Sequence, residues 1–563
     1  AANNTAVGRS ALGANTTGTN NVALGANALD ANTTANANTA IGVSALGANT
    51  TGASNIAIGH EALGANTTAS NNTAVGYGSL DANTTASNNT AVGFLSLSAN
   101  TTGADNSAVG KSALTGNTTG GQNVAFGENA LGSNTTAASG VAVGYRALLA
   151  NTTGANNTAV GRSALTANTT GIQNVAVGAE SAEANTTGNY NVAIGYRSLE
   201  ATTTGSQNVA IGRSAMESNT TASNNTAVGF AALEVNTTGH SNTAVGKSAL
   251  VANTTASSNT AVGRSALLAN TTGSSNVAVG NQTLDSNTTG HSNCAFGSDL
   301  PGVVVGSPLH SNTTGFRNSA FGNSALATNT TGTQNVAIGG AALHLSTTAS
   351  NNTGIGYSAL RANTTGTANV AVGFQSGDAI TTGTENTLIG HNSTASAVNA
   401  AYQTVLGSGV VCVGNSNFTF GNGTNDSNIA FGATSITAPS DLRLKEDVET
   451  STAGLSFIND LRPVTYKWKK EKDIPEALDA YVEGSENRLI NNTTNHGFIA
   501  QEVKVAIDAH SELKDGFDMW MEKDSDGQQR IAPSALVPIL VKAMQEQQAL
   551  IEALTARITT LEG

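Results

Sequence analysis

A 17-residue repeat dominates this sequence, and its marker is a glycine that closes a short Ala-Val or Ala-Ile segment. The marker glycines begin with Gly8, Gly25 and Gly42 and keep the same step as far as Gly297; the pattern resumes at Gly322. A fixed period of this size is typical of stacks of identical small units in which each unit contacts only its neighbours. The repeat therefore predicts an elongated shaft rather than a domain with an enclosed pocket.

Residues 21–34 represent one unit of this repeat. Val22 and Leu24 alternate with Ala23, the two-residue period of a β-strand, so we expect Val and Leu to anchor one face and Ala to occupy the other. The recurring alanine predicts that a second strand or a neighbouring chain lies close to its face. Leu29, four residues after the marker glycine, is expected to be a second inward anchor. In the following Asn-Thr-Thr-Gly or Asn-Thr-Thr-Ala, Asn can bind its own backbone and Gly tolerates a positive φ, which predicts a turn.

No unit of this kind is expected to fold alone. Each offers about three apolar side chains, whose burial stabilises by roughly 1.5–3 kcal/mol apiece, whereas ordering each backbone residue costs about 1–2 kcal/mol. Stacked units would align identical Asn and Thr positions into ladders. The Asn-Thr-Thr run also matches the acceptor sequence for N-glycosylation, but the turn requires the same residues, and we favour the turn.

The composition changes abruptly near residue 439. Residues 1–439 carry ten Lys/Arg and fifteen Asp/Glu, a net charge of −5, and residues 440–563 carry fourteen and twenty-two, a net charge of −8. The negative balance predicts no phosphate-neutralising basic stripe and therefore no nucleic-acid partner. Because no run of about 18 apolar residues occurs, we expect no membrane insertion. Cys294 and Cys412 lack CxxC partners and are expected to be small buried side chains, and the scattered histidines suggest neither a metal site nor a cofactor.

The repeat is interrupted once, between Gly297 and Gly322, where the step is 25 residues and the eight extra residues fall within 298–310. Insertions in a stack of coils usually emerge as loops on one face, and such loops often bind partners. A plain bulge or bend is the alternative. If the insertion is a binding loop, the candidate contact residues are Asp299, Pro301, Pro308 and His310.

The sequence divides into three parts. Residues 1–390 form the regular repeat shaft. Residues 391–439 form an irregular β neck, in which the spacing of the glycines becomes uneven. Residues 440–563 form a separate domain.

The repeat unit resembles the head repeats of trimeric bacterial adhesins, whose Val-Ala-Ile-Gly strands form β-rolls packed as trimers. It also resembles the Ala-Asn-Thr-Thr-Gly repeats of phage and bacterial surface fibres. This resemblance covers residues 1–432 and implies a mainly β fold, either a β-solenoid or a β-prism, in a trimer. Three side-by-side β-rolls and three intertwined chains both remain open.

The carboxy-terminal part contains three motif blocks in order: Ser440-Asp-Leu-Arg-Leu-Lys445, Leu461-Arg-Pro-Val-Thr-Tyr-Lys-Trp468 and His496-Gly-Phe-Ile-Ala-Gln-Glu-Val503. This set resembles the self-cleaving intramolecular chaperone domain at the end of phage endosialidase tailspikes and many tail fibres. The resemblance implies that Ser440 is a nucleophile, that Lys445 is its base, and that they cut the Pro439–Ser440 bond. The alternative is a capping serine and a surface lysine.

We expect an α+β fold for residues 440–563, with a helix over 454–461, a strand over 464–469 and a second strand leading into a helix over 501–509. The final helix carries apolar residues at alternating steps of four and three, which predicts a coiled coil over about 536–561. Its isoleucines and leucines favour a dimer on the general rule, whereas the resemblance implies a trimer. A trimerising domain would prevent slipped pairing, because shifting one chain by one repeat buries almost the same contacts. The seam is formed by Leu540, Met544, Gln547, Ile551, Leu554, Ile558 and Leu561.

These features predict a homotrimeric fibre, on a virion tail or a bacterial cell surface, that attaches to a host-cell receptor or glycan without a cofactor. A polysaccharide-degrading tailspike is an alternative, but it requires clustered carboxylates, and the acids of the shaft appear singly in the sequence. A passive spacer fibre is a further alternative.

Overall fold

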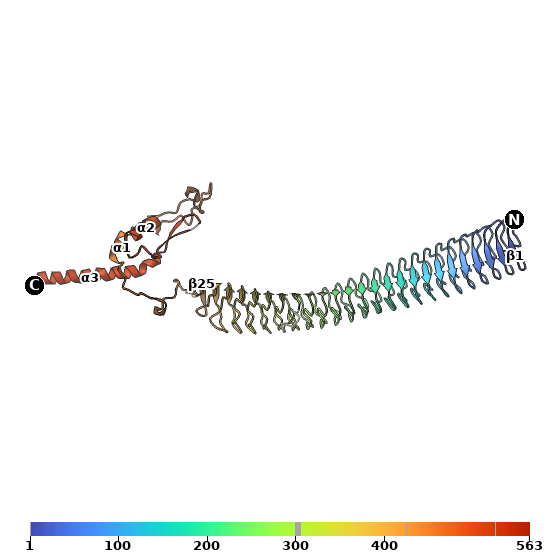
Figure 1. Ribbon diagram of the computed structural model, residues 1–563, viewed down its shortest axis with the longest axis horizontal. Coiled ribbons are helices and arrows are strands. Elements are labelled where there is room, and N and C mark those ends of the chain that lie inside the picture. Colours follow the sequence, from blue (N-terminus) through green and yellow to red (C-terminus); the bar gives the residue numbers. More distant parts are fainter. Residues whose placement is uncertain (1, 299–305, 424, 524) are drawn as a thin grey trace. The chain divides into compact units, whose positions relative to one another are not determined.

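The computed structural model describes residues 2–298, 306–423, 425–523 and 525–563 (Figure 1). These residues form two compact units, Ala1–Pro439 and Ser440–Gly563, which are described separately below.

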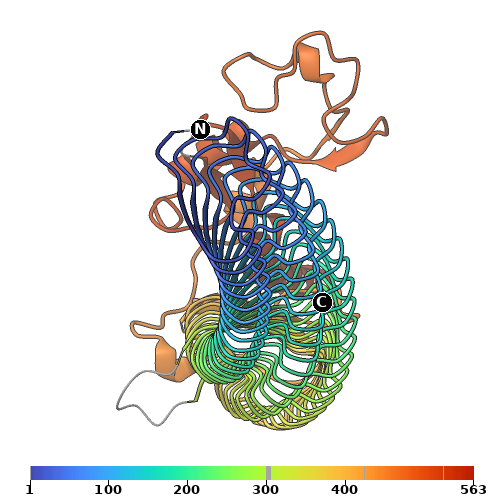
Figure 2. The same ribbon diagram turned by 90° about the vertical axis from the view of Figure 1, so that its right-hand side faces the viewer.

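The first unit is a β-solenoid of 17-residue repeats, as the sequence predicts (Figure 1). Each repeat forms one coil that contributes one short strand, and each strand pairs in parallel and in register with the equivalent strand of the next coil, so that Ala23 lies beside Ala40. Figure 2 shows the coils stacked behind one another with a gradual rotation along the shaft. The strands of the parallel stack are β1 (Thr5–Val7), β2 (Val22–Leu24), β3 (Thr39–Ile41), β4 (Ile56–Ile58), β5 (Thr73–Val75), β6 (Thr90–Val92), β7 (Ser107–Val109), β8 (Val124–Phe126), β9 (Val141–Val143), β10 (Thr158–Val160), β11 (Val175–Val177), β12 (Val192–Ile194), β13 (Val209–Ile211), β14 (Thr226–Val228), β15 (Thr243–Val245), β16 (Thr260–Val262), β17 (Val277–Val279), β18 (Cys294–Phe296), β19 (Ser319–Phe321), β20 (Val336–Ile338), β21 (Thr353–Ile355), β22 (Val370–Val372), β23 (Thr387–Ile389), β24 (Thr404–Ser408) and β25 (Asn417–Asn422).

The interior of each coil is lined by the small residue of the strand and by the leucine of the next segment. Ala23 and Leu29 are both fully buried, so Leu29 is the inward anchor that the sequence predicts. The expectation that Val22 and Leu24 also point inward is wrong, because both lie on the outer face of the sheet with exposed fractions of 37% and 46%. The interior is narrow, and alanine is the side chain that fits between the strand and the opposite wall of the coil.

The marker glycines are required both by backbone conformation and by space. Gly25 has a φ of +143°, and a Cβ built on it would lie 2.4 Å from the carbonyl oxygen of Gly42 in the next coil. The glycine of Asn-Thr-Thr-Gly is different from the expectation: Gly18 has no positive φ, and Ala35 fills the same place one coil later. Besides the marker itself, the left-handed positions of a coil lie five residues before the marker and two and four residues after it, as at Asn20, Asn27 and Leu29, with φ of 59°, 59° and 53°.

The predicted polar ladders are confirmed. Asn49 lies in the turn and donates from Nδ2 to Oδ1 of Asn32, one coil earlier, at 3.2 Å. The Thr33 hydroxyl donates to the Thr50 carbonyl at 3.2 Å. Since the Asn side chains of these turns, such as Asn32, are fully buried, a glycan could not reach them without unfolding the coil.

The interruption after Gly297 leaves the register of the stack intact. β18 pairs with β19 across the longer step, with Ala295 beside Ala320. Asp299 and Pro301 lie outside the described residues. Pro308 and His310 do not belong to a projecting loop, which corrects the sequence-based boundary. Pro308 is buried and accepts a hydrogen bond from the Leu284 N–H at 3.2 Å, because Ser307 to His310 already form the next coil around the buried Leu309.

The stack continues past residue 390 and ends in a hairpin. β24 and β25 pair in parallel at a shorter step, with Thr404 beside Phe418. β26 (Asn425–Ala430) then pairs with β25 in the antiparallel direction. The hairpin strand covers the hydrogen-bonding edge of β25, which an open stack would expose to further strands.

The second unit is a small α+β domain that ends in a long helix, as predicted. Its core surrounds the fully buried Phe457 and includes Val503, Ile507, Met519 and Ile539 from three helices and a hairpin. Its elements are η1 (Leu442–Leu444), α1 (Leu455–Asp460), β27 (Val464–Tyr466), η2 (Glu471–Asp473), β28 (Asn495–Gly497), α2 (Ala500–Ala509), β29 (Trp520–Glu522), β30 (Gln529–Ile531), η3 (Pro533–Leu536) and α3 (Val537–Glu562). β27 pairs with β28 and β29 with β30, both in the antiparallel direction.

The two cysteines differ in their surroundings. Cys412 is buried, as expected, but Cys294 is only half-buried on the outer face of β18, and burial raises the pKa of its thiol. Among the described helices, none combines the length and apolar character needed to cross a lipid bilayer.

Candidate functional site

Ser440 and Lys445 lie together at the start of the second unit. The Lys445 ammonium donates a hydrogen bond from Nζ to Ser440 Oγ at 2.7 Å. The short helix η1 bends the chain between them, and Lys445 caps it by donating its N–H to the Leu442 carbonyl at 3.1 Å. The turn therefore closes the five-residue separation and brings a potential base to a potential nucleophile.

Asp441 is engaged with Arg443 rather than with the serine–lysine pair. Its Oδ1 accepts hydrogen bonds from the Arg443 N–H at 2.9 Å and from Nε at 3.0 Å. These contacts with the Arg443 guanidinium hold the pKa of Asp441 below its usual range and raise that of Arg443. Asp441 therefore stabilises the turn that positions Ser440 and Lys445.

The serine–lysine pair is open to solvent within one chain. Leu442 and Leu444, which lie between Ser440 and Lys445 in η1, are 71% and 72% exposed. A lysine serves as a base only after its ammonium loses a proton, which exclusion of water promotes. The isolated chain provides the contact between the two groups but does not provide a dry environment.

The comparisons with known proteins address this same segment. Residues 440–511 match the family described as chaperone of endosialidase. The chaperone match begins at Ser440 and spans η1, α1, β27, η2, β28 and α2. No curated protein matches the chain. The chaperone segment and the 17-residue β-solenoid together support a tail fibre with an endosialidase-type chaperone.

Helix α3 presents one apolar face to its own domain and leaves another uncovered. Ile539 and Ala543 are buried in the core beside α1. The residues of the predicted seam are exposed, with fractions from 42% at Leu540 to 85% at Leu561. A surface helix normally has one apolar face, whereas α3 carries a second apolar face that one chain leaves exposed.

The outer face of the solenoid sheet is a further apolar surface. The prediction that its apolar residues point inward is wrong. We call this surface the outer strip: the third residue of each of the 24 strands β1 to β24. Each of these residues is Val, Leu, Ile or Phe, each is at least partly exposed, and none is charged. Aligning the repeats reveals this column, but its outward direction depends on the width of the coil.

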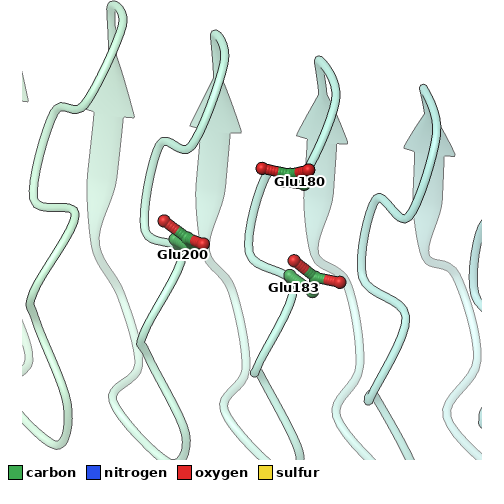
Figure 3. A group of neighbouring side chains, drawn as sticks. All are labelled: Glu180, Glu183 and Glu200. Carbon is green, nitrogen blue, oxygen red and sulfur yellow. The ribbon is translucent and has the colours of Figure 1, made fainter.

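Carboxylates that are scattered in the sequence meet on the solenoid, so the expectation of isolated acids is wrong. Glu180, Glu183 and Glu200 lie with carboxylate oxygens within 4.8 Å of one another (Figure 3). Arg197 bridges the group at 2.9 Å from Glu180 and 3.5 Å from Glu200. Hydrogen bonds from Arg197 and Arg162 lower the pKa of Glu180, while burial raises that of Glu200. The group is an ion-pair network on the side of the shaft.

Proposed function

We propose that this chain is the subunit of a homotrimeric fibre, on a virion tail or a cell surface, that attaches to a host-cell receptor or glycan. Residues 1–390 act as the shaft, 391–439 as the neck, and 440–563 as a chaperone that aligns three chains and then cuts itself off. The match to the chaperone of endosialidase supports this division of roles.

The observation that carries the proposal is the uncovered seam of α3. Leu540, Ile551 and Leu554 belong to a stripe with coiled-coil spacing, and each is at least 42% exposed in one chain. Apolar residues at this spacing pack into matching seams of parallel helices. Three copies of α3 would bury these stripes against one another and fix the axial register of the chains that precede them.

The outer strip provides a second reason for association. A soluble monomer rarely exposes continuous apolar patches larger than a few hundred Å², and this strip extends over 24 coils. Contact between the strips of neighbouring chains would remove it from water. Since each coil presents nearly the same strip residues, the strips of two chains could also pair when shifted by one or more coils. Helix α3 would set the correct axial register.

Self-cleavage follows from the serine–lysine contact. Ser440 Oγ attacks the carbonyl carbon of Pro439 and the Pro439–Ser440 C–N bond breaks, which leaves an ester on Oγ. Lys445 Nζ takes the hydroxyl proton and delivers it to the departing amine. Water then hydrolyses the ester, and the products are residues 1–439 with a free carboxylate and residues 440–563 with a free amine.

Assembly would control this reaction. A trimer that covers Leu442 and Leu444 would also exclude water from Lys445, which favours the neutral amine that the reaction needs. Cleavage would thus follow alignment of the three chains. The released shaft would have lost the domain that aligned it, so disassembly would become effectively irreversible.

The test combines oligomeric state with cleavage. In the full chain, Ile551→Asp with Ile558→Asp places charge in the seam. Ala549→Asp with Ala556→Asp places the same charge on the same helix, but on the side that faces away from the seam. We expect the seam variant to remain monomeric and uncleaved by native mass spectrometry, whereas the control forms cleaved trimers. A seam variant that still forms cleaved trimers would contradict the proposal.

Attachment is tested separately with purified, labelled fibres on host cells. Adsorption that survives deletion of 299–305 would exclude the inserted segment as the receptor contact. If the fibre binds no cell, it would be a passive spacer, and another protein would provide the adhesive tip.

A further inference from the structure

The corner that follows each strand collects the cations of the shaft. The residue after the marker glycine, or the next one, is Lys or Arg in eight coils, whereas residues 1–439 contain ten Lys and Arg in all. Parallel stacking places these corners in one column, about 4.8 Å apart per coil. Although acidic residues take the same corner in three other coils, this column of corners therefore holds eight cations: Arg9, Lys111, Arg146, Arg162, Arg197, Arg213, Lys247 and Arg264.

Four consecutive coils of this column form a continuous group, which we call the cationic ridge: Arg213, Phe230, Lys247 and Arg264. The guanidinium carbon of Arg213 lies 5.7 Å from the centre of the Phe230 ring, and Lys247 Nζ lies 5.8 Å from it. Both cations thus hold positions beside the ring by cation–π attraction. All four side chains are exposed.

The ridge lacks the acidic partners that Lys111, Arg162 and Arg197 have in the same column. Lys111 pairs with Glu128 at 3.3 Å, and Arg197 contacts three glutamates. Within the described parts of the chain, the cations of the ridge form no ion pair with a carboxylate. An anionic ligand at the ridge therefore has no carboxylate partner to displace.

A neighbouring column of acidic residues ends partway along the ridge. The residue after the buried leucine or its equivalent is acidic in four consecutive coils, at Glu183, Glu200, Glu217 and Glu234. In the next two coils this position is Val251 and Leu268, beside Lys247 and Arg264. The acidic column thus stops where the ridge is densest in cations.

We propose that the cationic ridge binds an acidic polysaccharide that lies along the shaft. One coil advances by about 4.8 Å, a length similar to one pyranose residue of an extended chain, so cations one or two coils apart can meet carboxylate or sulfate groups one or two sugars apart. A polymer of moderate charge density fits three cations beside an acidic column better than a nucleic acid does, because a nucleic acid would bring phosphates against Glu217 and Glu234. This inference rests on the proposed attachment function and names the chemical class of its ligand.

The test uses full-length protein with two acidic probes, heparin oligosaccharides and polygalacturonate oligosaccharides, and with dextran and single-stranded DNA as comparisons. The ridge variant replaces Arg213, Lys247 and Arg264 with Asn, which the chain itself places at the same corner in Asn281 and Asn323. The matched control replaces Arg9, Lys111 and Arg361 with Asn and so changes the net charge equally.

We expect the wild type to bind at least one acidic probe at low salt and to bind it more weakly as salt increases. The ridge variant should bind about tenfold more weakly or worse, and the control should stay within about twofold. Equal losses in both variants, unchanged binding in the ridge variant, or tighter binding of DNA than of both acidic probes would overturn the inference. Trimers that adsorb to cells without binding either acidic probe would also overturn the inference, although they would support the proposed fibre. A ridge-dependent interaction in chains that fail to trimerise would support the ridge and contradict the fibre.

Discussion

The backbone N–H of Asn38 donates a hydrogen bond to Oδ1 of Asn21, seventeen residues earlier, at 2.9 Å. Nδ2 of the same Asn38 donates to the carbonyl of Gly52 at 2.9 Å, and its Oδ1 accepts from the Asn55 N–H at 2.9 Å, so one buried residue links the repeats on both sides of it. Because the Asn38 side chain is wholly buried, each hydrogen bond that it makes replaces one to water. Each bond that is lost leaves a buried polar group unpaired, which costs stability. The ladder is therefore a source of cooperativity between coils as well as of stability.

Breaking one rung of this ladder should loosen its neighbours. Asn225 accepts from the Asn242 N–H at 2.9 Å and donates to the Gly239 carbonyl at 2.9 Å. Asn225→Ala leaves the Asn242 N–H buried without this partner, whereas the Gly239 carbonyl keeps its hydrogen bond from Asn236 Nδ2 at 2.9 Å. We expect a cost of about 1–3 kcal/mol. Native-state hydrogen exchange over residues 208–242 measures the opening free energy. Thr221→Ala, an exposed change in the same region, should cost less than about 0.5 kcal/mol; equal effects would contradict the ladder.

A marker glycine should not tolerate a methyl group. Gly212 has a φ of +134°, and a Cβ there would lie 2.5 Å from the Gly229 carbonyl oxygen. Gly212→Ala combines backbone strain of about 1–3 kcal/mol with a clash that only separation of the coils relieves, so we expect a lower melting temperature and easier proteolysis nearby. Gly47→Ala serves as the control, since Gly47 has no positive φ, the atom nearest to a Cβ there is the Ser44 carbonyl oxygen at 3.3 Å, and Asp30 occupies the equivalent position one coil earlier. If both variants melt together with the wild type, the close approach of the coils is not required.

The serine–lysine pair makes a prediction about cleavage. Ser440→Ala removes the attacking oxygen and Lys445→Met removes the base, so both should stay at full length, and the wild type should yield fragments 1–439 and 440–563 by intact mass. Arg530→Met, a change of exposed charge elsewhere in the domain, should cleave normally. Cleavage of Lys445→Met at the wild-type rate would eliminate the lysine as base.

The chaperone domain should lose stability as pH rises above about 6.5, the ordinary pKa of histidine. His510 binds Asp460 at 2.8 Å and Glu512 at 3.1 Å, and the bond to Asp460 is the main cause of its raised pKa. A folded-state pKa above the unfolded value means that the stabilisation is complete below about pH 6.5 and disappears as pH rises through the folded-state pKa.

The measurement is the melting temperature at 222 nm of the uncleaved Ser440→Ala chain, because the described helices all lie in residues 440–563. His510→Gln should flatten the dependence, whereas His496→Gln, at an exposed position, should leave it unchanged. A dependence that persists without the His510 imidazole would assign the effect to another group.

Periodicity was sufficient to predict the solenoid, the in-register ladders and the buried Leu29, because identical positions must stack when a repeat recurs at a fixed step. It did not predict which face of the strand points inward, since alternation alone assigns Val22 and Leu24 to one side without giving the width of the coil. Charge counting likewise missed the cationic ridge and the Glu180 group, because stacking brings together residues separated by one or more repeats. In the second unit, residue spacing placed Ser440 near Lys445 only as a possibility, and η1 supplies the bend that realises it.

The equivalence of the coils also bears on how such a chain evolves. Each added or deleted coil would preserve the contacts of Gly25 with Gly42 and of Asn21 with Asn38 in every remaining pair. Recombination between neighbouring copies of the repeat could therefore lengthen or shorten the protein in whole steps without designing a new interface. The reach of the molecule would be an inherited variable that changes faster than its fold.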